Sequence, residues 1–544
     1  MSFSRRATSR IARMTPTFTR LFACLPAALA LLSPVAHGAD APRCTYYEIA
    51  TLPIRYAGPG LTPAVDGSID GMPATLLVDT GAFDTILTMT GVVKRDLPLH
   101  MTGRYVNGIS GFSRLYVTRV KEFGVGPTRT TRRLDLPVVY ETAFTPAFDA
   151  ILGSPFLLQR DLEFDLGAKK IRFFQPENCK DVPLQIWQEQ AVSVPFERSR
   201  DSSPNPHFTA IVNGKEVDAM IDTGAHRSFL QRRAAKNVGI DVTAPGVTRM
   251  GDSGGIGADR APHWIAPVKS IQIGDETIKD AEIGVIESQG SDGADLYLGQ
   301  DFLRSHRVLF AMSQRKLYFT YTGGDVFTRG TGLEPWMRTE ADGGNADAQY
   351  VLSTMYGNGR GGVARDPLVA QVWLDMAVKS GQPHANLIAG RRALLAGHAD
   401  QAIPLLRKAL DQLPAERFGA LWLYTARMKN GEAELARSEL AASMDKQHDE
   451  AWPEPVGRFY LGKIDAARLL DEAGRDKDNA ARRRCQAEGY VAEWYRAQGD
   501  TARADALAAE ARARCAPPAR TLAAQNTPQA APPAAKTPTD DATP

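Results

Sequence analysis

Short apolar runs separated by turn residues fill the chain from about residue 45 to 321. Two of these runs read as strand, turn, strand. In one, Asp70–Gly71 interrupts SIDGMPATLLV, and in the other Asn213–Gly214 interrupts AIVNGKEVDAMI. Asp-Gly and Asn-Gly between apolar runs are strong hairpin signals. Because helical periodicity is nearly absent here, the pattern predicts an all-β region.

Four landmarks recur in this region, in the same order and at similar spacing. They are Asp-Thr-Gly at 79–81 and 222–224, each eight residues after a turn glycine; Gly-rich segments at 103–114 and 251–260; Leu-Gly at 152–153 and 298–299; and a closing hairpin pattern at 162–174 and 308–321. Coincidence of all four is improbable, so the region is a duplicated unit.

The pattern changes after residue 321. From about 335 to 515 the chain is rich in Ala, Leu, Arg and Glu, and its apolar residues follow helical spacing. Ala348 and Ala385 are 37 residues apart, a period typical of stacked helical hairpins. Residues 341–385 resemble a SEL-like repeat of the tetratricopeptide superfamily, and 397–414 and 497–515 resemble looser units. We interpret Trp373, Trp422 and Tyr424 as solenoid core rather than a ligand cage.

Both ends of the chain differ from its body. Residues 1–39 combine unopposed arginines, the apolar run LFACLPAALALLSPVA and a small-residue exit, which is typical of a cleaved signal peptide. The run is too short and proline-broken to favour a membrane anchor, and Cys24 lacks the apolar stretch that a lipoprotein would need. We expect a periplasmic or secreted protein with no stable membrane insertion after signal cleavage. Residues 516–544 are rich in Pro, Ala and Thr, which predicts a disordered tail.

Export changes the meaning of the cysteines. Removing Cys24 leaves an even number in an oxidising compartment: Cys44, Cys179, Cys485 and Cys515. Four cysteines allow three pairings, of which the local one, 44–179 with 485–515, is the most economical. The chain has no CxxC or HExxH spacing, so we expect neither a metal site nor a cofactor.

The composition and charge of the chain bear on one class of partner. The chain is 43% hydrophobic and 23% charged, as globular proteins are, and its net charge is +2. No basic block stands out in the body, so nucleic acid is not an expected partner.

The doubled Asp-Thr-Gly suggests chemistry. An apolar strand that ends in Asp, Thr and a permissive Gly places a carboxylate at a tight loop within apolar surroundings. Two such carboxylates, one from each facing lobe, could share one proton because like charges at close range do not both ionise readily. One carboxylate would then take a proton from water while the other protonates the carbonyl oxygen.

Residues 45–321 resemble two retropepsin-type aspartic peptidase units fused in one chain. The resemblance rests on DTGA and on the apolar ILG and YLG, and it implies a multidomain protein: an all-β bilobal aspartic-peptidase fold with lobes at 40–180 and 190–325, then an all-α tetratricopeptide-type solenoid at 335–515. It also implies a catalytic pair, supporting loop residues and two substrate-covering flaps. These are Asp79 and Asp222; Thr80, Gly81, Thr223 and Gly224; and Asn107, Gly108 and Gly111 with Gly254 and Gly255.

The two copies are not identical. Five residues past each acid, one copy has Asp84 and the other Arg227, so the two halves of a substrate groove would prefer different side chains. Asp165 in the first closing hairpin corresponds to Ala311 in the second. Tyr105 is the nearest candidate for a flap tyrosine.

One motif competes with this interpretation. GDSGG at 251–255 spells the nucleophile loop of chymotrypsin-like serine peptidases. That chemistry also needs a histidine and an orienting acid in the right context, which the sequence lacks. A Gly-rich hairpin tip is the better interpretation. We interpret His263, His306 and His384 as ordinary surface or packing residues.

The leading hypothesis is an exported aspartic endopeptidase that cleaves protein or peptide substrates, with helical repeats that recruit substrates or a protein partner. Ala82 and Ala225 carry no hydroxyl for the carboxylates, so activity is expected at milder acidity than in stomach-type enzymes. The alternative is an inactive peptide-binding module on the same scaffold. A third arrangement pairs lobes between chains, although the short linker at 175–192 favours pairing within one chain.

Overall fold

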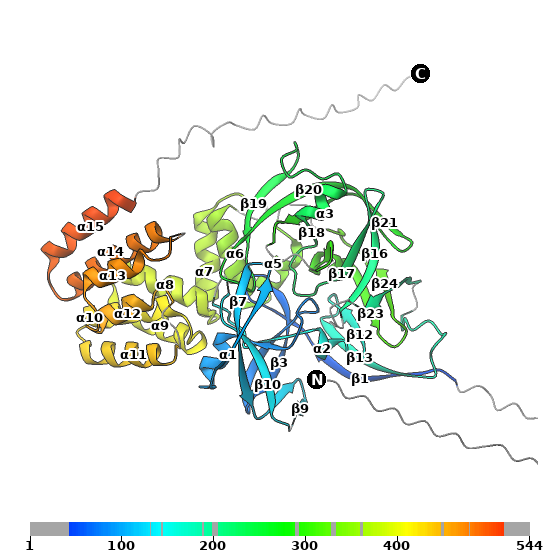
Figure 1. Cartoon of the computed structure of the whole chain (residues 1–544), viewed down its shortest axis with the longest axis horizontal. Helices are drawn as coiled ribbons and strands as arrows, with labels where there is room; N and C mark the ends of the chain where they lie inside the picture. The colour runs from blue at the N-terminus through cyan, green and yellow to red at the C-terminus, as the bar shows by residue number, and fades with distance from the viewer. Residues whose placement is uncertain are drawn as a thin grey trace, which may run out of the picture. The chain divides into compact units, whose positions relative to one another are not determined.

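The computed structural model describes residues 43–130, 132–142, 145–187, 190–198, 205–288, 293–327, 333–359, 363–447, 451–477 and 479–515. The predicted signal peptide and C-terminal tail lie outside these residues. The described chain forms a β-rich region followed by an all-helical region of stacked helices, drawn in blue to green and in yellow-green to red (Figure 1). Within the described residues, no helix is long and apolar enough to cross a membrane.

The first lobe is built on one sheet of ten strands. Its order is β6-β7-β10-β5-β11-β4-β3-β8-β9, and β2 pairs with β3 beside this path. The strands are β2 (Arg55–Ala57), β3 (Thr62–Ile69), β4 (Met72–Val78), β5 (Ile86–Leu87), β6 (His100–Gly108), β7 (Gly111–Val120), β8 (Phe123–Val125), β9 (Thr128–Thr130), β10 (Leu134–Val139) and β11 (Ala150–Leu152).

The second lobe repeats the arrangement with eight strands, in the order β15-β16-β17-β22-β18-β21-β20-β19. In both lobes the strand that ends before the acid pairs in parallel with the Leu-Gly strand, β4 with β11 and β17 with β22. This repetition agrees with the predicted duplication. The strands are β15 (Glu197–Arg198), β16 (Pro206–Val212), β17 (Lys215–Ile221), β18 (Phe229–Gln231), β19 (Thr248–Ser253), β20 (Ala261–Ile273), β21 (Glu276–Ile286) and β22 (Leu296–Leu298).

The predicted hairpin turns are present in both lobes. Asp70 and Gly71 have φ of 51° and 78°, and Asn213 and Gly214 have 50° and 80°. Two consecutive residues with positive φ match the twist of the flanking strands, and Asn, Asp and Gly tolerate this region best. These turns therefore fix the register of the strand that leads into each acid.

A six-stranded sheet joins the two lobes within one chain. Its order is β1-β13-β12-β23-β24-β14, and β12 of the first lobe pairs with β23 of the second, with Leu162 opposite Phe310. A disulfide between Cys44 and Cys179 ties the strand ends of β1 and β13, as the local pairing predicted. The strands are β1 (Thr45–Pro53), β12 (Asp161–Asp165), β13 (Lys170–Glu177), β14 (Val192–Pro195), β23 (His306–Ala311) and β24 (Lys316–Tyr321).

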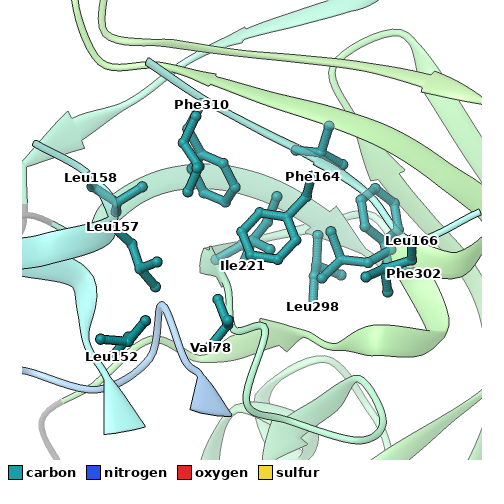
Figure 2. Packing of buried hydrophobic residues seen from close by; sticks show 14 of the residues in the cluster. Val78, Leu152, Leu157, Leu158, Phe164, Leu166, Ile221, Leu298, Phe302 and Phe310 are labelled. Carbon is teal, nitrogen blue, oxygen red and sulfur yellow. The ribbon is translucent and has the colours of Figure 1, made fainter. Parts of the chain in front are cut away.

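The apolar core lies directly beneath the two Asp-Thr-Gly loops. Val78 and Ile221, the residues before the two acids, pack with Leu152, Leu298 and the rings contributed by β12, β23 and α4 (Gln300–Ser305) (Figure 2). Val78, Leu152 and Leu298 are fully buried. Burial of each such side chain contributes ~1.5–3 kcal/mol relative to exposure, so one shared core holds both loops in place.

Short helices inside the lobes are the main local difference from the prediction. They are α1 (Met89–Lys94), α2 (Ser154–Leu157), α3 (Arg232–Asn237) and α4 (Gln300–Ser305). None exceeds six residues, so none shows enough of the helical period to be read from the sequence. The side chain of Thr88 caps α1 by accepting the Gly91 N–H.

The C-terminal region is helical throughout its described residues. Ala348 and Ala385 each occupy the third position of a helix and are fully buried, so the 37-residue spacing matches equivalent places in two helices. Trp373 and Tyr424 are buried in the helical core as predicted, and Trp422 is partly buried. The helices are α5 (Pro335–Asp342), α6 (Ala346–Asn358), α7 (Pro367–Lys379), α8 (Pro383–Leu395), α9 (Ala399–Gln412), α10 (Arg417–Lys429), α11 (Ala433–Asp445), α12 (Glu454–Tyr460), α13 (Ala466–Ala473), α14 (Ala480–Ala497) and α15 (Thr501–Cys515).

A second disulfide, Cys485–Cys515, joins α14 to the end of α15. Both pairings are therefore the local ones. The remaining two of the three possible pairings are excluded.

Candidate active site

The two Asp-Thr-Gly loops have nearly the same local geometry. The Asp79 N–H donates to the Leu152 carbonyl at 3.0 Å, and the Asp222 N–H donates to the Leu298 carbonyl at 2.9 Å. The backbone of each acid is therefore hydrogen-bonded to the Leu-Gly strand of its own lobe, at the point where the loop begins. Because that strand packs on the shared core, the position of each carboxyl follows from the fold.

Each carboxyl also accepts backbone hydrogen bonds from its own loop. Oδ1 of Asp79 accepts the N–H groups of Gly81 and Ala82 at 2.8 and 3.1 Å. Oδ1 of Asp222 accepts those of Gly224 and Ala225 at 2.9 and 3.1 Å. One oxygen of each carboxyl is thus held by the backbone, and the other is left for chemistry.

Thr80 and Thr223 connect the two loops reciprocally. The Thr80 N–H donates to Oγ1 of Thr223 at 2.9 Å, and the Thr223 N–H donates to Oγ1 of Thr80 at 3.1 Å. Each hydroxyl donates onward to the opposite lobe, to the carbonyl of Ile221 at 2.7 Å and of Val78 at 2.9 Å. Both threonines are fully buried. These four bonds set the distance between the two acids.

The two carboxyl groups interact with each other across the lobe interface. Burial, followed by the negative charge and hydrogen bond of Asp222, raises the pKa of Asp79 well above its ordinary value. Burial also raises the pKa of Asp222, although the hydrogen bond from Asp79 favours its ionised form. The pair therefore holds one proton over a range of pH in which a lone exposed carboxyl would be ionised.

The two Gly-rich segments form hairpins whose tips meet. We call β6–β7 and β19–β20 the flap hairpins, with tips at residues 108–111 and 254–260. The Ser110 N–H donates to the Ile256 carbonyl at 3.0 Å, and Oγ of Ser110 accepts the Gly255 N–H at 2.7 Å. The Asp259 N–H donates to the Ser110 carbonyl at 2.9 Å. Ser110 is thus the centre of a hydrogen-bonded contact between the tips.

The isoleucine at each tip lies against the opposite lobe. Ile109 of the first tip packs in a cluster with Ala225, beside Asp222. Ile256 of the second tip packs in a cluster with Ala82, beside Asp79. The tips therefore cross, and each closes against the loop of the other lobe.

The glycines predicted for the flaps lie at this crossing. A Cβ on Gly108 would meet the Ile256 carbonyl oxygen at 2.4 Å, and one on Gly255 would meet Cγ2 of Ile109 at 2.5 Å. Gly111 pairs with Gly108 across the first tip, whereas Asn107 and Gly254 are exposed. Tyr105, on β6, is 67% exposed. The crossing of the two tips thus depends on the absence of a side chain at Gly108 and at Gly255.

The asymmetric pair lies beside the two loops. The Asp84 carboxylate accepts the Thr85 N–H at 2.7 Å, whereas Arg227 lies 3.7 Å from the Glu334 carboxylate, just before α5. Next to Arg227, the ring of His226 is hydrogen-bonded to the Gly60 carbonyl of the first lobe. Burial and the Arg227 charge lower the pKa of His226 to about 4, so this ring is neutral near pH 7.

The serine-peptidase motif has a structural explanation. Ser253 lies at the end of strand β19, and its Oγ is 3.1 Å from Nδ1 of His263 on the neighbouring strand. Nε2 of His263 is buried and, among the described residues, has no hydrogen-bond partner, so no acid orients the ring. The other two histidines pack as predicted, His306 against Phe302 and His384 against Tyr350.

Sequence reasoning did not identify Ser110, Ile109 or Ile256 as site residues. A signal was present: both Gly-rich segments place an isoleucine between small residues, as NGISG and GGIGA. An apolar residue at a hairpin tip indicates a packing contact, but it does not identify the partner.

Residues 65–156 and 208–302 match the family model described as Aspartyl protease. Each matched segment runs from the strand before the turn to the helix after Leu-Gly. Among solved structures, the crystal structure of aspartic proteinase from Irpex lacteus is similar at 13% identity, with a TM-score of 0.35, over 52% of this chain and 100% of that chain.

Proposed function

We propose, from the membership of residues 65–156 and 208–302 in the aspartyl protease family, that this protein is an aspartic endopeptidase. Its substrates are peptides or proteins, and Asp79 and Asp222 activate the attacking water. The observation that carries the proposal is the pair of half-buried, interacting carboxyl groups, with one member from each lobe.

The proposed reaction uses the one proton that the two carboxyls share. We assign this proton to Asp79, so that Asp222 is the ionised member of the pair. The Asp222 carboxylate takes a proton from water while the water oxygen bonds to the peptide carbonyl carbon. Asp79 donates its proton to the carbonyl oxygen, which gives a neutral tetrahedral diol. Asp222 then gives the proton that it took from water to the nitrogen, and Asp79 takes back a proton from one hydroxyl of the diol. Cleavage of the C–N bond releases an acid and an amine.

The flap hairpins give the site a closed form. Their tips are hydrogen-bonded over the two loops, so an extended peptide can enter only after the Ser110 contacts open. Closure over a bound peptide excludes bulk water and strengthens the electrostatic effect of the carboxyl pair.

The rest of the chain suggests where this activity is used. Two disulfides and the signal-like segment at 1–39 favour a periplasmic or secreted location. The helical region fits a tetratricopeptide-type solenoid with SEL-like repeats, an architecture that presents surfaces to proteins. The alternative function is peptide binding without cleavage, in which the groove and scaffold remain and the chemistry is absent.

The test is incubation of the purified protein with a diverse peptide pool, beside the Asp79→Asn variant. We expect new termini within the peptides for the wild type and none for the variant. A wild-type protein that retains peptides but generates no new termini would support the binding module instead.

The pH dependence follows from the raised pKa values. Activity needs one proton on the pair, so it falls as pH rises through the upper pKa, where both carboxyls ionise, and falls again as pH drops below the lower one. Since burial raises both values and Ala82 and Ala225 offer no hydroxyl, we expect maximal kcat/KM above about pH 3. A pH–rate profile on one peptide measures this, and a maximum below that pH would contradict it.

A further inference from the structure

We propose that the helical region is a working part of the peptidase, because it holds the segment that fixes both flap tips. This segment is the connection between β10 and β11, of which residues 140–142 and 145–149 are described. Arg417, Glu416 and His384 are then positioning residues for the flaps. The proposal rests on the proposed function for its kinetic consequence, but its structural consequence can be measured without any cleavage.

The outer side of the connection is bound to α8 and α10. Oγ1 of Thr145 donates to the Glu416 carboxylate at 2.6 Å, and Nε2 of His384 is 3.0 Å from the Thr145 carbonyl oxygen. Nη2 of Arg417 donates to the Tyr140 hydroxyl at 2.9 Å. Two residues beyond Thr145, Ala147 packs against the apolar cluster formed by α8, α9 and α10.

Glu416 binds in two directions, which makes this contact specific. One carboxylate oxygen accepts the Phe418 N–H at 3.1 Å and so caps the start of α10. The other accepts the hydroxyl of Thr145. A shift of α10 relative to the first lobe would break one of these bonds.

The inner side of the same connection binds both flap hairpins. The Glu141 carboxylate accepts the Ser113 hydroxyl at 3.0 Å and the Arg114 N–H at 2.6 Å, and it also pairs with the Arg114 side chain. These contacts belong to β7 of the first hairpin. The Glu141 carbonyl oxygen accepts the Gly257 N–H at 3.0 Å, and Thr142 forms a bridge with Ile256. These contacts belong to the tip of the second hairpin.

The distance along the chain between the two sides is very short. Tyr140 contacts α10, and the adjacent Glu141 contacts both flap hairpins. A movement of α10 is therefore transmitted directly to the flap hairpins. The connection is also fixed below, because the hydroxyls of Thr88 and Thr90 donate to the carbonyls of Phe148 and Pro146, both at 2.7 Å. Its described residues, 140–142 and 145–149, are therefore held on both sides and can support the closed tips.

The corresponding segment of the second lobe is built differently. Glu287, which follows β21, pairs with Arg232 of its own lobe, and its N–H donates to Pro262. Among the described residues of these two segments, the contacts with α8 and α10 are therefore those of the first lobe. This contact with the helical region therefore makes the two duplicated lobes unequal.

The test is the Arg417→Ala, Thr145→Val double variant of the full chain, with Arg437→Ala as the matched control. Arg437 lies on α11 and pairs with Glu434 three residues earlier. Hydrogen exchange is followed for peptides that cover 107–113 and 254–260, and for β12 of the interlobe sheet as a reference. We expect exchange at both tips to become about tenfold faster and β12 to remain unchanged. With a cleavable peptide, KM is expected to rise about tenfold while kcat changes less than about twofold.

Unchanged exchange at both tips in a folded double variant would overturn the proposal, whatever happens to cleavage. Exchange that becomes equally fast in β12 would also overturn it, because that indicates a general loss of structure. If the double variant does not fold, Thr145→Val alone is measured in the same way and the same criteria apply. A wild type that cleaves nothing refutes the proposed function, yet the exchange comparison still decides whether the helices hold the flaps.

Discussion

The Asp79→Asn protein is expected to lose about 10³- to 10⁴-fold in kcat, at the upper end of what general acid–base catalysis contributes. Asparagine has nearly the same shape, and its carbonyl oxygen can still accept the N–H groups of Gly81 and Ala82. What it lacks is the transferable proton. The same loss is expected for Asp222→Asn, because that amide cannot take a proton from water.

Steady-state hydrolysis of one defined peptide measures this effect, with peptide binding measured in parallel. Asp135→Asn is the matched control, since Asp135 is an exposed residue of β10 paired with Arg119. Peptide binding is expected to change only a few fold, because neither substitution alters the contacts of the flap tips. A variant that keeps a tenth of wild-type kcat would refute the role of the pair.

The fold of the lobes was predictable because its signals are local. Asp-Gly and Asn-Gly determine the turns, and alternating apolar residues determine the strands. Asp-Thr-Gly follows the second strand of each hairpin, which leads to the interlobe core. Once a duplication is recognised, facing acids follow from approximate symmetry. The disulfides were predictable for a different reason, since Cys44 and Cys179 bracket the first lobe and Cys485 and Cys515 are only 30 residues apart.

The crossing of the flap tips could not be predicted in the same way. It depends on Ser110, whose partners Gly255 and Ile256 are about 145 residues away in the chain. Nothing in the local pattern around Ser110 distinguishes a serine that joins two lobes from one that faces solvent. The support from α10 is still less visible, because Arg417 and Tyr140 belong to regions with different periodicity. Long-range polar contacts of this kind require the coordinates.

Gly224→Ala is expected to have the second-largest effect on catalysis, with a loss in kcat of about 10²-fold or more. A Cβ at Gly224 would lie 2.4 Å from Cγ of Asp79 and 2.6 Å from both of its carboxyl oxygens. Gly81 has the reciprocal relation to Asp222, at 2.6 Å. Neither glycine is among those with positive φ, so the cost is a steric clash rather than backbone strain. The added methyl group must push the two carboxyls apart.

Separation of the carboxyls makes a second prediction that distinguishes this variant from one that is merely unstable. When they no longer share a proton, the pKa of Asp79 loses the contribution of its neighbour, and the alkaline limb of the pH–rate profile moves to lower pH. Gly489→Ala is the matched control, because a Cβ there meets no atom within 4 Å and alanine favours the helix α14. A Gly224→Ala protein with an unshifted alkaline limb and wild-type kcat would show that the two acids do not work as a pair.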